Sequence, residues 1–163
     1  MYPHSRVDFF YLHVFYMGIF FYPGGDFMNL SVIRNMDTST GLAYKIARIV
    51  YAETGAKSLP GVEALTSMIK NLSDASGVCI SNLISDQDIF TALSEKSPRH
   101  CRMQTLPTQR GFQMCLRTAQ RMLRGGLPDC CYGATRFHHA DTMPDWARAR
   151  GYIADIDGML FYF

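Results

Sequence analysis

A single carboxylate stands in line with the apolar residues of a predicted helix. In the stretch "IARIVYAETGAKSLPG", residues 46–61, apolar side chains recur at helical spacing at Ile46, Ile49 and Val50. At about 100° per residue, Glu53 falls within roughly 20° of Ile46 and so at the centre of that apolar stripe. Because an acid stands where a leucine would be expected, Glu53 is a candidate catalytic residue.

Two roles are open for Glu53. In a structural role, a buried carboxylate needs a hydrogen-bond partner, for which Tyr51, Thr54 or an arginine from elsewhere in the chain are candidates. In a catalytic role, the apolar surroundings are themselves useful. Burial in an apolar wall raises the pKa of a carboxyl group and makes it a usable general acid. Cleavage of a glycosidic bond is the reaction that most often needs such an acid.

Most glycosidases also use a second carboxylate, as nucleophile or as base. The candidates in this sequence are Glu63, Asp86, Asp88, Asp141 and Asp145. None of them has a spacing that fixes it opposite Glu53, so the sequence leaves this second role open.

The cysteines and histidines suggest other chemistry. The five cysteines are an odd number, so they cannot form a fully paired set of disulfides within one chain. Cys130 and Cys131 precede His138 and His139, but adjacent ligands match no zinc pattern of two short-spaced pairs, and we predict no metal. The same residues could form a thiol amidase or peptidase, with a cysteine nucleophile and a histidine base. The alternative is that these thiols are buried or weakly reactive.

Three helices are predicted to position these groups. Thr38 to Thr40 offer an N-cap for a first helix, which ends at Gly55. Ser58 and Pro60 begin a second helix. The apolar side of this second helix contains Val62, Leu65, Met68, Ile69 and Leu72. A third helix is predicted over residues 108–124, with its exposed side carrying Arg110, Arg117, Arg121 and Arg124.

Residues 73–107, between the second and third helices, have weak periodicity and several turn-forming residues. We expect an irregular stretch with short helical turns around Leu83 and Phe90. Loops of this length are uncommon in compact domains unless they have a function. The stretch is therefore a candidate wall of a ligand cleft.

The chain is predicted to end in a small antiparallel sheet. The segment "GATRFHH", residues 133–139, is short and rich in β-forming residues. The segment "YIADIDGMLFYF", residues 152–163, contains two alternating runs joined by Asp157-Gly158, a dipeptide suited to a type I′ hairpin turn. A helical lobe followed by a small sheet is an α+β arrangement, and ligand clefts commonly form where two such parts meet.

Length and composition indicate one globular domain. A chain of 163 residues with 48% hydrophobic residues can bury a core, and a formal charge of +2 is too small to indicate nucleic acid as a partner. The aromatic segment "FFYLHVFYMGIFFYPGG" is too short to span a bilayer comfortably, so we expect no transmembrane anchor. Residues 1–37 are interpreted as an N-terminal extension or an atypical export signal, and residues 38–163 as the working domain.

Two segments together resemble the catalytic domain of bacterial cell wall hydrolases of the spore-cortex-lytic (SleB/CwlJ) type. They are "ARIVYAETGAKSLPGVEALTSMIKNL" and "GATRFHHADTMPDWARARGYIADIDGMLFYF". Their shared features, in the same order, are a V-Y-A-E core, a downstream helix, a G-A-x-x-F strand, a P-x-W-A segment and a last strand that ends in F-Y. The resemblance covers roughly residues 43–163.

This resemblance implies a lysozyme-like domain, related to lytic transglycosylases, that cuts the glycan strands of peptidoglycan. Glu53 matches the catalytic acid of the family. It would protonate the leaving glycosidic oxygen and then act as a base toward the C6 hydroxyl of muramic acid or toward water. Such a mechanism needs no second carboxylate and no cofactor.

The resemblance also implies which residues contact the sugar. Thr135, Phe137 and His138 correspond to the strand that lines the glycan groove; the alternatives are packing for Phe137 and a surface position for His138. Trp146, the only tryptophan, either stacks on a sugar face or anchors a loop. Asn71, at the predicted close of the second helix, either caps that helix or faces the groove.

Three functions therefore remain open. They are glycan cleavage by Glu53, a non-catalytic peptidoglycan-binding module, and an amidase that uses Cys130 or Cys131. For the first two, the partner is the glycan strand of peptidoglycan, so the site of action is periplasmic or extracellular, in the cell wall. We expect a monomer.

Overall fold

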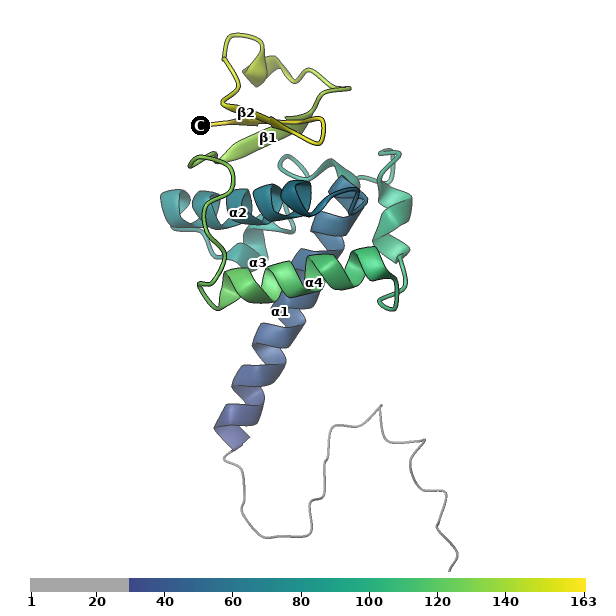
Figure 1. Ribbon diagram of the computed structural model, residues 1–163, viewed down its shortest axis with the longest axis vertical. Coiled ribbons are helices and arrows are strands. Elements are labelled where there is room, and N and C mark those ends of the chain that lie inside the picture. Colours follow the sequence, from purple (N-terminus) through teal and green to yellow (C-terminus); the bar gives the residue numbers. More distant parts are fainter. Residues whose placement is uncertain (1–29) are drawn as a thin grey trace, which may run out of the picture.

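The computed structural model describes residues 30–163, and for residues 30–40 the helical backbone alone. Within this range the α-helices are α1 (Leu30–Thr54), α2 (Leu59–Ser76), α3 (Ile80–Leu83) and α4 (Arg110–Leu123). Short 3₁₀ helices are η1 (Thr91–Leu93), η2 (His100–Gln104) and η3 (Asp145–Ala147), and the strands are β1 (Arg136–His139), β2 (Ala154–Ile156) and β3 (Met159–Tyr162). The helices form a lobe with the sheet at one end of it (Figure 1), which confirms the predicted α+β arrangement.

Helix α1 carries the apolar stripe that the spacing predicts. Ile46, Ile49 and Val50 are buried, and so is Glu53 in the last turn. The N-terminal boundary differs from the prediction, because the helix begins at Leu30 and runs through the proposed N-cap at residues 38–40. None of the helices in the described part of the chain combines the length and apolar character that a membrane span requires.

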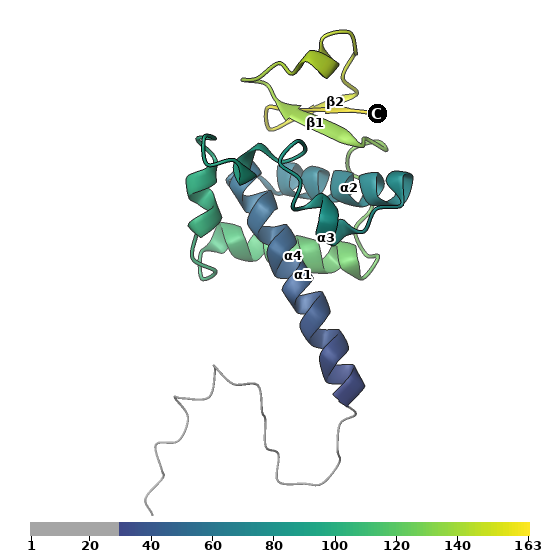
Figure 2. The same cartoon turned by 180° about the vertical axis from the view of Figure 1, so that it is seen from behind.

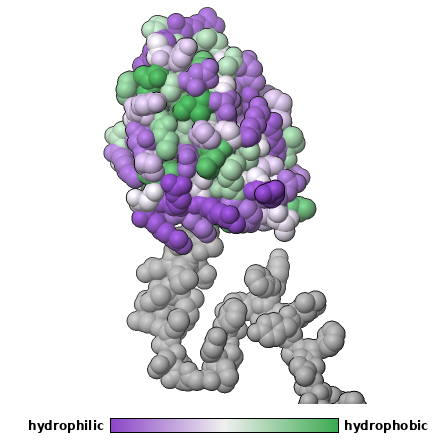
Figure 3. All heavy atoms as spheres, viewed as in Figure 1, coloured by the Kyte–Doolittle hydropathy of each residue, from purple (hydrophilic) through white to green (hydrophobic). Residues whose placement is uncertain are grey.

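Helices α1 and α4 form the main packing contact of the lobe. The α4 side chains Phe112, Cys115 and Ala119 are fully buried, and the Phe112 ring lies 5.1 Å from that of Tyr44 on α1. The opposite side of α4 exposes its arginines as predicted. In Figure 3, hydrophilic residues gather along the edge of the lobe where α4 lies in Figure 1.

Helix α2 begins as the sequence predicts and ends later. The Ser58 Oγ accepts a hydrogen bond from the Gly61 N–H at 3.1 Å, and proline occupies the first turn. The helix continues past Asn71 to Ser76, so the predicted role of Asn71 as a cap is wrong. Its buried side packs Val62 and Leu65 into the core that α1 and α4 share.

Residues 77–109 form the predicted irregular stretch. Within it, α3 ends at Leu83 and η1 follows directly after Phe90, which is fully buried. Seen from behind in Figure 2, this stretch wraps across the helical lobe on the side of α3. The short helical turns are therefore where the sequence placed them, with η2 as an additional one.

The three strands form an antiparallel sheet in the order β1-β3-β2. Asp157 and Gly158 connect β2 to β3, and both have positive φ, 57° and 74°, as a type I′ turn requires. In the register, Phe137 pairs with Phe161 and His139 with Met159. Side chains directly opposite each other share a face of the sheet, so this face, which carries the buried Phe161 and Met159, lies against the helical lobe.

Candidate active site

Glu53 lies in the last turn of α1, and its side chain has no exposed surface. Its carboxylate accepts hydrogen bonds from two other parts of the fold. The Ala92 N–H donates to Oε1 at 2.8 Å, and the Thr91 hydroxyl lies 3.3 and 3.2 Å from the two oxygens. The His139 Nε2 lies 2.7 Å from Oε2. The apolar stripe of α1 is therefore only part of the surroundings of this acid, which also include polar partners.

The partners of Glu53 are not those that the sequence suggested. Tyr51 directs its hydroxyl to Gln109, and the Thr54 hydroxyl donates to the carbonyl of Val50, one turn earlier in α1. The groups that bind Glu53 come instead from segments far along the chain, η1 and β1. At the start of η1, the Ala92 N–H is one of the backbone donors that a helix leaves unsatisfied, so it is available to the carboxylate.

Strand β1 brings His139 to Glu53 by alternation of its side chains. Phe137 and His139 are two residues apart and share the face toward the lobe, where their rings lie 5.6 Å apart, edge to face. His138 lies on the opposite face. Its two ring nitrogens are 2.9 Å from the Tyr162 hydroxyl and 2.9 Å from the His139 carbonyl oxygen.

The structure places the two histidines on different faces of the sheet. His138 is buried on the outer face, within an aromatic cluster, so the alternative of a surface position is wrong, and it is absent from the linings of the two pockets described below. The neighbouring His139 points toward Glu53. A strict period of two, counted from the apolar Phe137, is the signal in the sequence that selects His139.

The hydrogen bond between Glu53 and His139 can exist in two proton states. An ionised carboxylate only accepts, so His139 donates through its Nε2–H while Glu53 is charged. When Oε2 carries the proton, it donates to an unprotonated Nε2 instead. The proton can thus reside on either side of one short contact of 2.7 Å. This arrangement is suited to general acid and base chemistry.

A pocket of about 230 Å³ opens beside this pair, where the lobe meets the sheet. The residues that line it are mostly polar or charged: Glu53, Thr54, Lys57, Pro98, Arg99, Arg102, His139, Asp141, Asp157 and Met159. Three of them, Pro98, Arg99 and Arg102, belong to the irregular stretch 77–109. The prediction that this stretch forms a cleft wall is confirmed.

A second pocket, of about 290 Å³, lies at the other end of β1 and is more apolar. Its lining includes Thr135, Phe137 and Trp146, three of the residues predicted to contact sugar, together with Leu72, Asp88, Ile89 and Arg136. Trp146 also anchors its loop, since its ring meets those of His138 and Tyr162 edge to face at 5.8 and 5.2 Å. Both predicted roles of Trp146 are therefore compatible with its position.

Asn71 lies in neither pocket lining. Its side-chain N–H groups donate to the Asp129 carboxylate at 3.1 Å and to the Ala134 carbonyl at 3.3 Å. These bonds tie α2 to the turn that leads into β1. The structure therefore shows a positioning contact for Asn71 within the fold.

Among the five candidates for a second carboxylate, Asp141 lines the same pocket as Glu53. It forms an ion pair with Arg99, with 2.6 Å between the nearest atoms. Glu63 and Asp145 pair with Arg121 and Arg148. Asp157 also lines the Glu53 pocket, although its sequence pattern indicates only a turn.

Cys130 and Cys131, the two cysteines considered as nucleophiles, lack the pKa shift of a reactive thiol. All five are free. Burial, and then the charge of Asp129, raise the pKa of the Cys131 thiol to about 12, and burial also raises the pKa of the Cys130 thiol. The nucleophile of a cysteine enzyme needs the opposite shift. Within the described residues, no cluster of three or more His, Cys, Asp or Glu side chains is arranged to hold a metal ion.

Comparison with protein-family models, with curated proteins and with solved structures finds no match to this chain. The α+β arrangement thus stands on the structure itself, a helical lobe with a three-stranded antiparallel sheet. The lysozyme-like fold and the resemblance to cell wall hydrolases remain predictions.

Proposed function

We propose that this protein cleaves the glycan strands of peptidoglycan, with Glu53 as the general acid and then as the base. The observation that carries the proposal is a buried carboxylate at the end of a helix, 2.7 Å from a histidine nitrogen, lining a polar pocket where lobe and sheet meet. The ordered motifs that resemble cell wall hydrolases place their catalytic acid at this same residue. A lysozyme-like fold is part of the proposal.

The two oxygens of Glu53 have different tasks in this mechanism. Oε1 accepts the Ala92 N–H, a fixed backbone donor, so it remains an acceptor throughout. Oε2 carries the proton and gives it to the glycosidic oxygen as the C–O bond breaks. The same Oε2 then takes a proton from the C6 hydroxyl of muramic acid, which yields an anhydro end, or from water, which yields a reducing end.

His139 is the more exposed partner of the pair, with 9% of its side-chain surface accessible against none for Glu53. In the proposed mechanism, bound substrate displaces the His139 ring from Oε2 and takes its place as the hydrogen-bond partner. Until then, the short contact holds the carboxylate in the orientation that the substrate meets. Such preorganisation avoids a reorganisation step when the substrate binds.

The second pocket supports an extended substrate. Thr135 and Phe137 lie at the beginning of β1 and His139 at its end, so the two pockets flank a strand whose residues rise about 3.3 Å each. We assign Thr135, Phe137 and Trp146 to contacts with sugar units further along the glycan. A linear polymer is the substrate class that fits two pockets arranged along one strand. The polymer lies in the cell wall, which makes the proposed location periplasmic or extracellular.

The test is mass spectrometry of the products that the full-length protein releases from purified peptidoglycan. We expect soluble muropeptides from the unmodified protein and none from Glu53→Gln, which keeps the shape of the side chain but cannot hold the proton. Glu63→Gln is the matched control and should retain activity, because Glu63 is half-buried on α2, pairs with Arg121 and lines neither pocket. Anhydro-muramic acid ends would indicate transglycosylation, and reducing ends hydrolysis. Undiminished release by Glu53→Gln would overturn the proposal.

A second candidate, a non-catalytic peptidoglycan-binding module, is favoured by one observation. The Glu53 carboxylate is fully covered and already accepts several hydrogen bonds, as a structural acid does. For this alternative, we expect the protein to sediment with cell wall sacculi, with no fragment in the supernatant. Glu53→Gln should then sediment as well as the unmodified protein.

A further inference from the structure

The Glu53 pocket has two cationic side chains that its own acids do not neutralise. Among residues 41–163, Arg99 pairs with Asp141, but neither Lys57 nor Arg102 forms a salt bridge. All three cations line the pocket. Two positive charges beside the proposed proton-transfer site would favour a negatively charged substrate over a neutral one.

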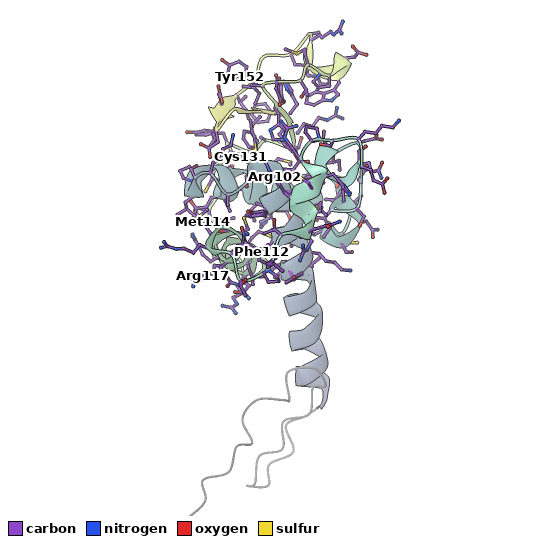
Figure 4. The ribbon with its side chains drawn as sticks, turned by 90° about the vertical axis from the view of Figure 1, so that its right-hand side faces the viewer. Arg102, Phe112, Met114, Arg117, Cys131 and Tyr152 are labelled. Carbon is purple, nitrogen blue, oxygen red and sulfur yellow. The ribbon has the colours of Figure 1, made fainter. Side chains whose placement is uncertain are left out.

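Arg102 is held in place by the end of α1. One of its terminal nitrogens donates to the Ala52 carbonyl at 3.3 Å, a group in the last turn of the helix, where carbonyls lack partners and a positive charge is favoured. Gly55 leaves room for this position, since a Cβ there would lie 3.2 Å from the same nitrogen and the guanidinium group would have to shift slightly. Figure 4 shows Arg102 near the junction of lobe and sheet.

A guanidinium group has five N–H donors, and the bond to Ala52 uses one of them. The planar arrangement of the remaining donors matches the two oxygens of a carboxylate. Lys57, at the surface just past the end of α1, lines the same pocket and adds a second positive charge. We call Arg102 and Lys57 together the proposed anion-binding corner.

The acids of the pocket do not fill this corner. The Glu53 carboxylate is occupied by Ala92, Thr91 and His139. Asp157 accepts a hydrogen bond from the Ser58 hydroxyl, at the start of α2. The acids of the pocket therefore leave Arg102 and Lys57 open to an anion from outside the chain.

We propose that Arg102 and Lys57 bind a carboxylate of the glycan beside the bond that is cut, so that the enzyme selects strands with a negative charge there. This inference rests on the proposed function. Peptidoglycan offers such a group in two forms, which are the lactyl carboxylate of muramic acid in strands without peptides, and the carboxylates of the stem peptide in intact strands. Both present the same chemistry to a guanidinium group.

The test compares four glycans for binding and for cleavage by the full-length protein. The first is peptidoglycan strand stripped of its peptides, and the second is the same strand with its lactyl carboxylates converted to methylamides. The third carries intact stem peptides, and the fourth is a neutral chito-oligosaccharide. We expect the stripped strand to bind about tenfold or more tightly than its methylamide, because a charge-assisted hydrogen bond is lost. If the stem peptide supplies the carboxylate, the intact strand should bind more tightly than the methylamide strand, and the stripped strand should not.

Substitutions at Arg102 and Lys57 test whether these two residues cause the preference for a carboxylate. Arg102→Gln and Lys57→Gln should each reduce binding of the carboxylate strand while leaving the methylamide strand unchanged. Lys57 is exposed, so its replacement leaves the fold intact and keeps the test valid if Arg102→Gln fails to fold. Arg117→Gln is the matched control, since Arg117 lies on the exposed side of α4, away from the sheet (Figure 4).

The outcomes separate this inference from the proposed function. Cleavage of all strands, with equal binding of the stripped, the intact and the methylamide strands, would overturn the carboxylate preference and leave Glu53 catalysis standing. Tight, Arg102-dependent binding of the carboxylate strand without cleavage would support the preference and contradict catalysis. Tighter binding of the methylamide or the neutral glycan would overturn the inference in either case.

Discussion

At the scale of single residues, the central feature is a buried carboxylate whose cost of burial is offset by hydrogen bonds. Backbone, hydroxyl and imidazole donors all reach Glu53. A buried carboxyl group with such partners is tolerated in the core, and removing one partner leaves part of its hydrogen-bonding capacity unsatisfied. The same contacts that make the carboxylate tolerable in the core also orient it toward the pocket, so structure and chemistry depend on one set of bonds.

Replacing His139 should therefore destabilise the fold. In His139→Ala the Oε2 atom of Glu53 loses its 2.7 Å partner, and we expect a loss of about 2–4 kcal/mol in the free energy of unfolding. Urea denaturation followed by circular dichroism measures it. In the background of Glu53→Gln the same replacement should cost less, because a neutral amide tolerates the missing donor better. Equal losses in both backgrounds would show that the two side chains do not interact.

Asp129 makes the stability of the fold depend on pH in the acidic range. Burial acts to raise the pKa of Asp129, but hydrogen bonds from the Cys131 N–H, Asn71 and the Gly133 N–H outweigh it and hold the pKa at about 2, below the ordinary 3.8. A depressed pKa means that this stabilisation is present above about pH 4 and is lost as the pH falls toward 2.

The substitution Asp129→Asn tests this dependence. The variant should lose about 1 kcal/mol of stability at pH 7, a small value because the side chain is exposed and solvent screens it. When urea unfolding is measured between pH 2 and pH 6, the free energy of unfolding of the variant should fall less steeply below pH 4 than that of the unmodified protein. An unchanged slope would assign the acid dependence to other carboxylates.

At the scale of elements, Arg48 connects α1 to the segment that carries Arg102. Its guanidinium donates to the Met103 carbonyl and, at 3.2 Å, to the Thr105 carbonyl, and it lies over the ring of Phe112 at 5.3 Å. These contacts fix η2 and the residues after it against the helix. The position of the proposed anion-binding corner therefore depends on an arginine outside the pocket.

We expect Arg48→Met to loosen this segment. Loss of hydrogen bonds from a partly buried charged donor should lower the free energy of unfolding by about 2–3 kcal/mol. Limited proteolysis should show faster cleavage within residues 94–107, because the two carbonyls no longer tie this segment to α1. Arg110→Met, at the exposed start of α4, is the control and should change neither measurement. Unaltered cleavage in Arg48→Met would mean that the segment is held by its other contacts.

Elements could be predicted well where periodicity and turn chemistry agree. The amphipathic α4, the capped start of α2 and the Asp157-Gly158 turn were all indicated by local patterns. The beginning of α1 was not, because the threonines at 38–40 resemble a cap but lie inside a longer helix. A local capping signal competes with helix propagation, and the sequence alone does not show which of the two prevails.

The candidate site was only partly predictable for a related reason. Glu53 could be found because its helix has a clear apolar stripe. Its partner could not, because the contact between Glu53 and His139 joins α1 to β1, 86 residues later, and no local pattern fixes such a pairing. The place of Arg102 in the pocket could not be predicted for the same reason, because this residue packs against Gly55 and bonds the end of α1, about 50 residues earlier.

At the scale of the whole molecule, the pocket exists because the sheet is attached to the helical lobe at defined points. Glu53 binds His139 on one side, Asn71 binds the Ala134 carbonyl, and Ser58 at the start of α2 binds Asp157 in the hairpin turn. Asp157 also lines the pocket. Anything that moves the hairpin away from α2 should therefore disturb stability and pocket together.

Gly61→Ala tests this attachment. Gly61 is buried in the first turn of α2, and a Cβ there would lie 3.0 Å from Cγ and 3.1 Å from Cβ of Asp157, closer than side chains pack. We expect a loss of about 1–3 kcal/mol from this overpacking, although alanine favours a helix. Gly41→Ala in α1, where a Cβ meets no atom within 4 Å, is the control and should leave stability unchanged or raise it by up to about 1 kcal/mol.

The double variant Gly61→Ala with Asp157→Gly decides whether the hairpin is the cause. The three atoms nearest to the new methyl group belong to the Asp157 side chain, and glycine accepts the positive φ of that turn position. Urea unfolding should therefore show most of the lost stability recovered, less the contribution of the bond to Ser58. If the double variant is no more stable than Gly61→Ala alone, the strain lies within α2 and the attachment of the sheet does not depend on this close approach.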